Sequence, residues 1–346
     1  MHTFEFEDHQ LSEIFKGNWQ LAGGHGNITP QEAMDTLIAY AQHGVNVFDV
    51  GDIYTGAEQM TGDFLKLYKE QFGEEACSKL RVHTKFVPDL NALEDLTEQD
   101  VRAIVERSIE RLGADKLNLV QFHWWDFNKG DYIQAAKYLD QLRQEGLIES
   151  IGLTNFDTEH TQALLDAGIP IRSNQIQFSL LDPRPFNGML QLAQKNNIAI
   201  FCYGTLAGGL LANSRPGEEP TNRSHIKYGL MIDEAGEAYY QATLAKVHEL
   251  ADKYETTVGN IATRFVLQTP GVSSAILGAR NNKHINELDE LADLRLNDED
   301  YAALASMMQE ALGTVTDDIY SYERDASGPH GRIMKYNLNG MRPDRD

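Results

Sequence analysis

Amphipathic stretches alternate with short apolar, β-branched runs along most of the chain. The segment ITPQEAMDTLIAYAQHG at 28–44 repeats apolar residues at helical spacing and leads into the apolar run VNVFDV at 45–50. The same order of helix-like segment, glycine and apolar run recurs at 96–123, 132–153 and 160–178. This alternation predicts βα units, and therefore a parallel sheet covered by helices.

Residues with capping chemistry mark the ends of the predicted helices. Thr29, followed by Pro30 and Glu32, has the spacing of a capping box with proline at the first helical position. Thr97 and Asp100 have the same spacing ahead of a second helix. Glycines that suit a left-handed helix end follow at Gly44, Gly113, Gly146 and Gly168. These signals predict helices that end just before the apolar runs.

The number and order of these units predict the fold. Strand-like runs lie near 14–19, 45–50, 81–86, 117–123, 149–153, 173–178, 198–203 and 273–277. Eight βα units in about 290 residues are typical of a (β/α)8 TIM barrel, which is an α/β fold. A doubly wound sheet is the alternative, and it would require G-x-G-x-x-G after its first strand. The nearest glycines, Gly23, Gly24 and Gly26, do not have that spacing.

Three segments lie outside the repeat, in a chain that we expect to fold as a single domain over 1–346. Residues 1–13 are expected to form a hairpin cap ahead of the first barrel strand. Residues 204–236 show little periodicity and predict a long loop, which in a compact domain is usually a functional lid or disordered. After a last helix near 298–312, residues 313–346 are expected to form a polar C-terminal tail.

Composition and charge narrow the range of partners. Of the 346 residues, 42% are hydrophobic and 24% are charged, which is typical of a globular protein. The formal net charge of −22 disfavours nucleic acid and anionic membranes, so a small molecule is the expected partner. The chain has two cysteines, no secretory leader pattern and no apolar run of about 18 residues, so we expect a cytoplasmic protein. Its oligomeric state stays open.

Polar side chains lie at the predicted ends of barrel strands, where TIM-barrel enzymes place their reactive groups. Asp49 and Tyr54 follow the second strand, Lys85 ends the third, and His123 ends the fourth. Each residue alone has a structural explanation, such as packing for a tyrosine or a solvent-directed amine for a lysine. On three neighbouring strands, however, they can converge on one point, and this predicts a site.

Such a group suits proton donation to a carbonyl oxygen. The ammonium group of Lys85 is expected to lower the pKa of the Tyr54 phenol from its usual value of about 10. The Asp49 carboxylate can hold Lys85 charged and in place, and His123 can hydrogen-bond the carbonyl oxygen and orient the substrate. Because none of these side chains is a strong nucleophile, the site also needs a source of hydride.

The chain contains six ordered stretches: FDVGDIYTGAEQMTG, VHTKF, LNLVQFHWW, IGLTNF, SNQIQFSLLDPRP and ILGARNNKHINE. Their order and spacing resemble those of the aldo-keto reductases from about residue 14 to residue 293, and the resemblance does not cover the tail past 313. It implies a (β/α)8 barrel that binds NADP(H) across its mouth. It also implies a catalytic tetrad of Asp49, Tyr54, Lys85 and His123, with Tyr54 as the general acid in reduction and the base in oxidation.

The resemblance further implies cofactor contacts. The carboxamide contacts fall on Thr154, Asn155 and Gln175. The aromatic residue that stacks on the nicotinamide is Tyr203, followed by Gly204 and Leu206. The adenosine-phosphate contacts fall on Gly278, Arg280, His284 and Glu287. Arg280 is the choice for the 2′-phosphate, because a guanidinium suits a phosphate dianion. NADPH/NADP+ is the expected cofactor, and NADH is kept as an alternative because His284 and Leu288 differ from the residues that are commoner in relatives.

Aromatic residues give two alternatives for the substrate pocket. Trp19, with Asn18, matches a segment that lines the pocket in relatives. Trp124 and Trp125 come directly after His123, with Phe127 close behind. They either pack in the core or form an aromatic wall that favours aromatic or flat carbonyl compounds.

The sequence leaves competing functions. An NADP(H)-dependent carbonyl reductase is the first hypothesis. The SLLDPRP stretch resembles the branch that includes potassium-channel β subunits, so the alternative is a nucleotide-binding regulatory subunit of the same fold with little turnover. A metal-dependent barrel hydrolase would need paired histidines such as H-x-H on the first strand, and the sequence has none there, so no metal is expected.

Overall fold

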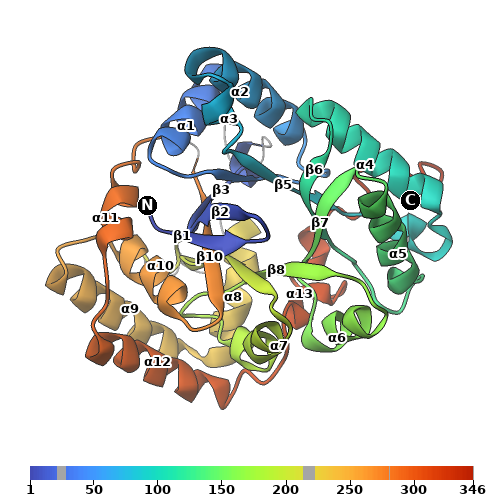
Figure 1. Ribbon diagram of the computed structural model, residues 1–346. Coiled ribbons are helices and arrows are strands. Elements are labelled where there is room, and N and C mark those ends of the chain that lie inside the picture. Colours follow the sequence, from blue (N-terminus) through green and yellow to red (C-terminus); the bar gives the residue numbers. More distant parts are fainter. Residues whose placement is uncertain (22–28, 213–222, 280, 346) are drawn as a thin grey trace. The chain divides into compact units, whose positions relative to one another are not determined.

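A computed structural model describes residues 1–21, 29–212, 223–279 and 281–345 of the chain. Its barrel strands are β3 (Ile14–Gly17), β4 (Val47–Asp49), β5 (Arg81–Phe86), β6 (Leu117–Phe122), β7 (Ile148–Thr154), β8 (Ile171–Gln177), β9 (Ala199–Tyr203) and β10 (Val272–Gly278). Within the described residues they close into a barrel in the order β10-β3-β4-β5-β6-β7-β8-β9 (Figure 1). The prediction of a (β/α)8 barrel is confirmed, and each strand overlaps its predicted run.

A short hairpin precedes the barrel, as predicted for the first 13 residues. Its strands are β1 (Thr3–Phe6) and β2 (His9–Ser12), which pair antiparallel with Phe6 opposite His9. The Phe4 ring stacks on Phe15 of β3 with centroids 6.2 Å apart, and the Phe6 ring lies 6.3 Å from His83 of β5. The hairpin therefore packs against two barrel strands through its aromatic residues.

Helices follow the strands. The α-helices are α1 (Pro30–Gln42), α2 (Ala57–Phe72), α3 (Glu74–Cys77), α4 (Glu98–Leu112), α5 (Tyr132–Gln144), α6 (Thr158–Asp166), α7 (Met189–Asn196), α8 (Arg223–Ala235), α9 (Glu237–Lys253), α10 (Val258–Gln268), α11 (Glu287–Asp293), α12 (Asp298–Leu312) and α13 (Ser321–Arg324). Short 3-10 helices are η1 (Trp19–Leu21), η2 (Leu90–Asp95), η3 (Arg184–Phe186), η4 (Ala207–Gly209) and η5 (Gly331–Ile333). None of these helices combines the length and apolar character needed to cross a membrane.

The predicted helix ends are confirmed. The Thr29 hydroxyl accepts a hydrogen bond from the backbone N of Glu32 at 3.2 Å, and the Glu32 carboxylate accepts one from the backbone N of Thr29 at 2.9 Å. Thr97 and Asp100 form the same reciprocal capping box at the start of α4. The predicted stops all have positive φ: Gly44, Gly113, Gly146 and Gly168. The last predicted helix is α12.

The prediction of a loop over 204–236 is wrong for part of this segment. Its first residues include η4 and its last ones form helix α8, while 213–222 lie outside the described residues. Met231 and Ile232 of α8 are buried, so this helix is stabilised by packing one face. The glycine in its middle, Gly229, weakens the helical signal that the sequence alone provides.

The chain forms two compact units. Unit 1 comprises residues 1–175, 276–285 and 335–346, and unit 2 comprises residues 176–275 and 286–334. Unit 1 holds the predicted tetrad, whereas unit 2 holds the segment after β8 and most of the C-terminal helices. The expectation of one domain for the whole chain stays a prediction.

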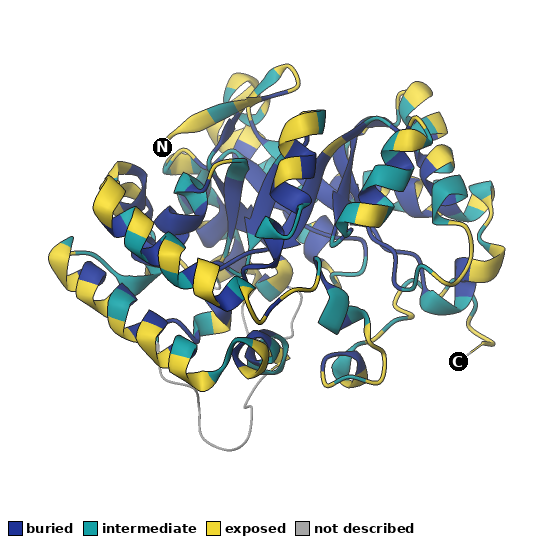
Figure 2. Cartoon of the chain, turned by 90° about the horizontal axis from the view of Figure 1, so that it is seen from below, coloured by how far each residue is buried: buried dark blue, intermediate teal, exposed yellow. Residues whose placement is uncertain are grey.

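The barrel strands of unit 1 are buried on both faces. Every residue of β3 and β4 is buried, and Figure 2 shows the strands dark blue while the helices have both buried and exposed faces. The Phe48 ring of β4 packs against Phe64 of α2 with centroids 4.7 Å apart. The predicted strand runs are apolar without alternation because helices cover the outer face of these strands.

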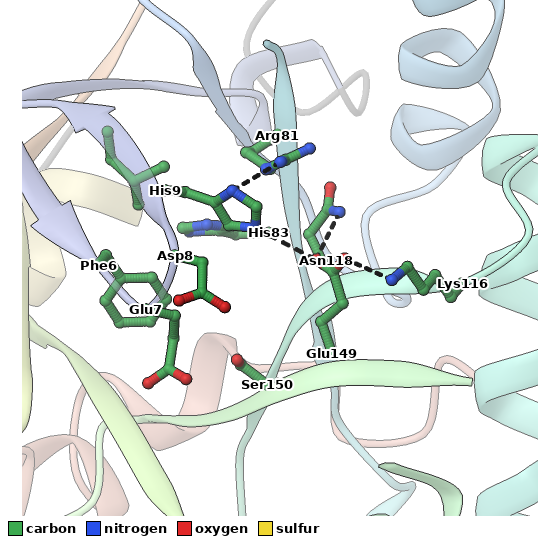
Figure 3. Close-up of a pocket in the computed structure, with 11 residues that line it drawn as sticks. Phe6, Glu7, Asp8, His9, Arg81, His83, Lys116, Asn118, Glu149 and Ser150 are labelled. Carbon is green, nitrogen blue, oxygen red and sulfur yellow. Dashed lines mark hydrogen bonds and ion pairs between the residues drawn. The ribbon is translucent and has the colours of Figure 1, made fainter. Parts of the chain in front are cut away.

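A cavity of about 260 Å³ lies between the hairpin turn and the first residues of β5, β6 and β7 (Figure 3). The carboxylate of Glu149 accepts hydrogen bonds from Lys116 at 2.7 Å and from Asn118 at 3.0 Å. Arg81 donates to Nδ1 of His9 at 2.8 Å. Part of the charged lining is therefore paired within the cavity, and the cavity lies at the strand starts rather than at the strand ends.

Unit 2 contains a buried cluster of charged side chains. Arg184, which is 1% exposed, donates to both carboxylate oxygens of Asp182 at 2.8 Å and to those of Glu323 at 2.8 and 2.9 Å. Burial acts to raise the pKa of Glu323, but Arg184 outweighs it and lowers that pKa to about 2. The cluster therefore fixes α13 to the segment that follows β8.

Replacing Glu323 with glutamine should destabilise the protein, because the buried guanidinium of Arg184 then keeps one charged partner. We expect a loss of about 3 kcal/mol in the free energy of unfolding at pH 7, measured by denaturant titration. Since the pKa of Glu323 is lower in the folded state, its contribution is present above about pH 4.5 and is lost as the pH falls toward 2. The variant should lack this part of the pH dependence.

The control for this prediction is Arg102→Gln, which removes an exposed pair. The side chains of Arg102 and Glu145 are 30% and 38% exposed, so we expect a loss of at most about 1 kcal/mol. If Glu323→Gln and Arg102→Gln lose the same free energy of unfolding, the buried Arg184 cluster stabilises the protein no more than an exposed ion pair does.

Candidate active site

A tight turn carries Tyr54 from the end of β4 to the start of α2. The backbone N of Tyr54 donates to the Gly51 carbonyl at 2.9 Å, and the backbone N of Ala57 donates to the Tyr54 carbonyl at 2.9 Å. Gly56 follows with a φ of +74°, a conformation that favours glycine. The turn brings the Tyr54 ring to the end of β5, where Nζ of Lys85 lies 4.7 Å from the ring centroid.

Lys85 and Asp49 form a buried ion pair beside this ring. Both side chains are 5% exposed, and Nζ of Lys85 donates to Oδ1 of Asp49 at 2.6 Å. Nζ also donates to the Val50 carbonyl at 2.7 Å. Two acceptors, one at the end of β4 and one directly after it, therefore fix the ammonium group next to the phenol.

The pKa of Tyr54 is raised, which differs from the sequence expectation. Burial is the largest cause, and the Lys85 charge acts in the expected direction without outweighing it, while the Asp49 charge adds to the rise. Burial also acts to lower the pKa of Lys85, but Asp49 outweighs it and the net pKa is raised. The pair is therefore a neutral phenol beside a charged ammonium at neutral pH.

The second oxygen of Asp49 is held by amides from two further strands. Nε2 of Gln121 donates to Oδ2 of Asp49 at 2.8 Å, and Nε2 of Gln175 donates to the same oxygen at 2.7 Å. Nε2 of Gln175 also donates to Oε1 of Gln121 at 2.8 Å. Sequence analysis did not single out Gln121, although a glutamine inside the apolar run LNLVQF is the signal that could have identified it.

His123 follows β6 and lies beside an aromatic ring. Its Nδ1 donates to the Thr154 carbonyl at 3.0 Å. Because a carbonyl only accepts, Nε2 accepts in the neutral ring and donates in the imidazolium form. The ring of Trp125 packs edge-on against His123 with centroids 4.5 Å apart, and the Trp125 indole N donates to the Pro88 carbonyl at 2.9 Å.

The expected carboxamide ligands lie next to one another in unit 1. The Thr154 hydroxyl donates to the Gln175 carbonyl at 3.3 Å, and the backbone N of Asn155 donates to the same carbonyl at 2.9 Å. Asn155 has a φ of +60°, which is uncommon for a residue with a side chain but is favoured by asparagine. This set of neutral amides and a hydroxyl has the chemistry to bind a carboxamide, and Gln175 links it to Asp49.

The expected adenosine-phosphate residues are only partly described. Gly278 ends β10, and a Cβ there would meet the end of the Gln20 side chain, which would have to move. His284 is exposed, and Glu287 begins α11 in unit 2. Arg280 lies outside the described residues.

In unit 2, Tyr203 ends β9 and contacts a lysine of α8. Nζ of Lys227 donates to the Tyr203 hydroxyl at 2.9 Å and lies 4.4 Å from the centroid of its ring. Burial lowers the pKa of Lys227 to about 8. Gly204 has a φ of +74°, and Leu206 is half-buried just before η4.

The three tryptophans expected near the substrate have different environments. Trp19 is 40% exposed and Trp125 is 7% exposed next to His123. Trp124 has no exposed surface, packs edge-on against Phe122, and donates its indole N to the Lys129 carbonyl at 3.1 Å. This environment fits the alternative in which Trp124 packs in the core. The ring of Phe127 stacks on His160 at 3.5 Å.

Two buried carboxylates near Tyr54 were missed by sequence analysis. Asp52 is 4% exposed, and burial together with the nearby charge of Glu58 raises its pKa to about 7. Glu58 is 1% exposed, accepts from the Thr84 hydroxyl at 2.6 Å, and pairs with Arg111 at 3.1 Å. The sequence signal that could have identified them is an acidic residue close to Tyr54 on either side.

In the described part of the chain, no group of three His, Cys, Asp or Glu side chains could hold a metal ion.

Comparison with known proteins gives relatives along nearly the whole chain. The model of the Aldo/keto reductase family matches residues 13–309. An NADH-specific methylglyoxal reductase of Escherichia coli is 27% identical over 325 residues, covering 88% of this chain and 97% of that protein. An aldo-keto reductase of Bacillus subtilis is 24% identical over 308 residues, covering 88% and 92%.

Solved structures have the same fold. A glycerol dehydrogenase from Gluconobacter oxydans has a TM-score of 0.75 and 24% identity, covering 92% of this chain and 97% of that chain. An aldo/keto reductase from Klebsiella pneumoniae in complex with NADP and acetate has a TM-score of 0.67 and 22% identity, covering 88% and 95%. The family match includes all four tetrad positions and every barrel strand. The chain belongs to the aldo/keto reductase family, whose members are oxidoreductases that use nicotinamide cofactors.

Proposed function

We propose that this protein reduces an aldehyde or ketone to an alcohol with NADPH, and that Tyr54 gives the proton to the carbonyl oxygen. The observation that supports this most directly is the position of Lys85. Its Nζ is 2.6 Å from Oδ1 of Asp49 and 4.7 Å from the centroid of the Tyr54 ring, in a buried environment. A fixed ammonium group there stabilises the phenolate that remains after proton donation.

Each tetrad side chain has a distinct task. When bound, the reduced nicotinamide supplies the hydride. The Tyr54 hydroxyl donates its proton to the oxygen of the substrate, and Asp49 keeps Lys85 charged and in place. His123 orients the substrate through Nε2, because Nδ1 is already used on the Thr154 carbonyl. Tyr54 and His123 then orient the carbonyl.

The raised pKa of Tyr54 suits the acid that reduction needs. A phenol that stays protonated at neutral pH is fully in its donating form. The difficulty lies in the product, since a buried phenolate is costly without a cation close to it. Lys85 is that cation, so the ion pair with Asp49 contributes to the state formed after proton transfer.

The residues present fit a nicotinamide cofactor. In unit 1, Thr154, Asn155 and Gln175 would hold the carboxamide, and Gly278, Arg280 and His284 would hold the adenosine phosphate. In unit 2, the candidates for the nicotinamide ring are Tyr203, Gly204 and Leu206, and the candidate for the adenosine phosphate is Glu287. NADPH is proposed over NADH because of the Arg280 guanidinium, although the Escherichia coli relative is named as NADH-specific.

The proposed setting is cytoplasmic, with a small molecule as substrate. The two cysteines, Cys77 and Cys202, are both free thiols, which fits a reducing compartment. The net charge of −22 supports a small-molecule partner over nucleic acid.

Replacing Tyr54 with phenylalanine should lower kcat for carbonyl reduction by at least about 100-fold, because the proton donor is lost. NADPH binding, measured by quenching of intrinsic fluorescence, should change by less than about twofold. Turnover is followed by NADPH absorbance on a panel of aldehydes, ketones and quinones. Tyr68→Phe on α2 is the control and should keep wild-type kcat.

Wild-type protein that binds NADPH tightly but turns over no member of the panel would favour the alternative, a nucleotide-binding regulatory subunit. Loss of NADPH binding in Tyr54→Phe would instead show that the tyrosine acts in cofactor binding.

The pH dependence of the two directions should differ. Reduction needs the neutral phenol, which is fully populated below the raised pKa, so kcat for reduction should stay nearly constant from pH 6 to 9. Oxidation of the alcohol needs the phenolate, so its kcat should rise about tenfold per pH unit over the same range. Parallel profiles in the two directions, measured at saturating substrates, would contradict Tyr54 as the shared acid and base.

Replacing Arg280 with alanine should raise the KM for NADPH about tenfold or more, because a guanidinium–phosphate contact is lost. The KM for NADH should change little, since NADH has no 2′-phosphate. Lys283→Ala, which removes an exposed cation three residues later, is the control. An equal rise in KM for both cofactors in Arg280→Ala would refute the proposed phosphate contact.

A further inference from the structure

The C-terminal residues 335–346 lie beyond the region that matches the family, which ends at residue 309, yet they belong to unit 1. The backbone N of Leu90 donates to the Tyr336 carbonyl at 3.1 Å. The Asp89 carboxylate accepts from the backbone N of Asn339 and of Met341, each at 2.7 Å. This C-terminal segment is therefore fixed along the residues that follow β5, the strand that carries Lys85.

Asn339 extends from the C-terminal segment to the turn that carries Tyr54. Its Nδ2 donates to Oδ2 of Asp52 at 3.0 Å and to the Val87 carbonyl at 2.7 Å. Its Oδ1 accepts a hydrogen bond from Arg107 of α4. One side-chain amide, with both its hydrogens and its oxygen bonded, thus joins the Tyr54 turn, the segment after β5 and α4.

Asp52 connects this amide to the turn. Its Oδ1 accepts from the backbone N of Ile53 at 3.0 Å, and its Oδ2 also accepts from the backbone N of Val87 at 3.1 Å. The backbone carbonyl of Asp52 accepts from Arg111 at 3.1 Å. Tyr54 follows two residues later, so a displacement of Asp52 would move the phenol relative to the ammonium of Lys85.

We propose that Asn339 is a positioning residue for Tyr54: its amide fixes Asp52, and with it the turn over residues 50–56, against the segment that follows Lys85. The inference rests on the proposed function, in which Lys85 stabilises the phenolate that Tyr54 leaves after donating its proton. The C-terminal segment then supports the active site from outside the region that matches the family.

Charged groups from each neighbouring element face Asp52. Glu58 lies on α2, Arg107 and Arg111 lie on α4, and Asp89 holds the backbone of Asn339. Burial and Glu58 raise the pKa of Asp52, whereas Val87, Asn339 and Arg107 act to lower it. Because the Asn339 amide stabilises the ionised carboxylate, the consequence of changing it depends on pH.

The first test compares Asn339→Ala with Asn337→Ala in the full chain. Asn337 is the same residue type in the same segment, but its side chain accepts from the backbone N of Asn91 at 3.1 Å. Asn339→Ala should lower kcat about tenfold with less than about a twofold change in the NADPH dissociation constant, because positioning affects the reacting geometry. Asn337→Ala should keep the wild-type kcat.

The second test replaces the donor with an acceptor of the same size, in Asn339→Asp. Two facing carboxyl groups can share one proton at low pH but repel each other when both are ionised. The kcat of this variant should approach the wild-type value near pH 5 and fall as the pH rises, whereas Asn337→Asp should keep the wild-type profile. A contact that only stabilises the fold would lower the melting temperature and leave the shape of the profile unchanged.

The third test does not need turnover. Amide hydrogen exchange in the peptide that contains residues 50–56 should be about tenfold faster in Asn339→Ala than in wild type or Asn337→Ala. If wild type lacks turnover and this exchange is faster, the proposed function fails and the positioning role stands. If wild type turns over and Asn339→Ala matches Asn337→Ala in kcat and in exchange, the positioning role is overturned.

Discussion

A lysine held away from water beside a phenol is the constraint on which the organisation of unit 1 depends. A buried ammonium group is costly unless a carboxylate and further acceptors compensate it. Asp49 and the Val50 carbonyl supply these acceptors for Lys85. Asp49 must in turn be held, and Gln121 and Gln175 hold its second oxygen from β6 and β8. One charged group therefore determines polar residues on several strands of an otherwise apolar barrel.

The barrel reconciles these buried polar groups with a stable fold. Parallel strands place their last residues at one end, so side chains far apart in sequence meet there without breaking the apolar layers. The cavity at the strand starts has its own paired charges, with Glu149 bonded to Lys116 and Asn118. Apolar contacts between strands and helices, such as Phe48 packed on Phe64 of α2, supply the burial that stabilises the unit.

Local rules predicted the elements well and the long-range contacts poorly. Capping boxes at Thr29 and Thr97 and the apolar runs depend on neighbouring residues, so the sequence contains them directly. Helix α8 was missed because packing compensates for Gly229, and the raised pKa of Tyr54 was missed because burial, unlike the charge of Lys85, cannot be read from a motif. The contact of Asn339 with Asp52 joins residues 287 positions apart, and no spacing rule indicates it.

The aromatic residues near His123 show how the chain beyond the family match bears on the site. Trp125 packs edge-on against His123, and the Tyr336 ring packs edge-on against Trp125 with centroids 5.1 Å apart. Rings in this geometry restrict one another's orientation, because each edge faces the electron-rich face of the next. The Trp125 indole is also fixed by the Pro88 carbonyl, so it cannot turn without displacing the segment that the C-terminal residues hold. The geometry around His123 therefore depends on Pro88 and Tyr336, which belong to the same two segments that contact the Tyr54 turn through Val87 and Asn339.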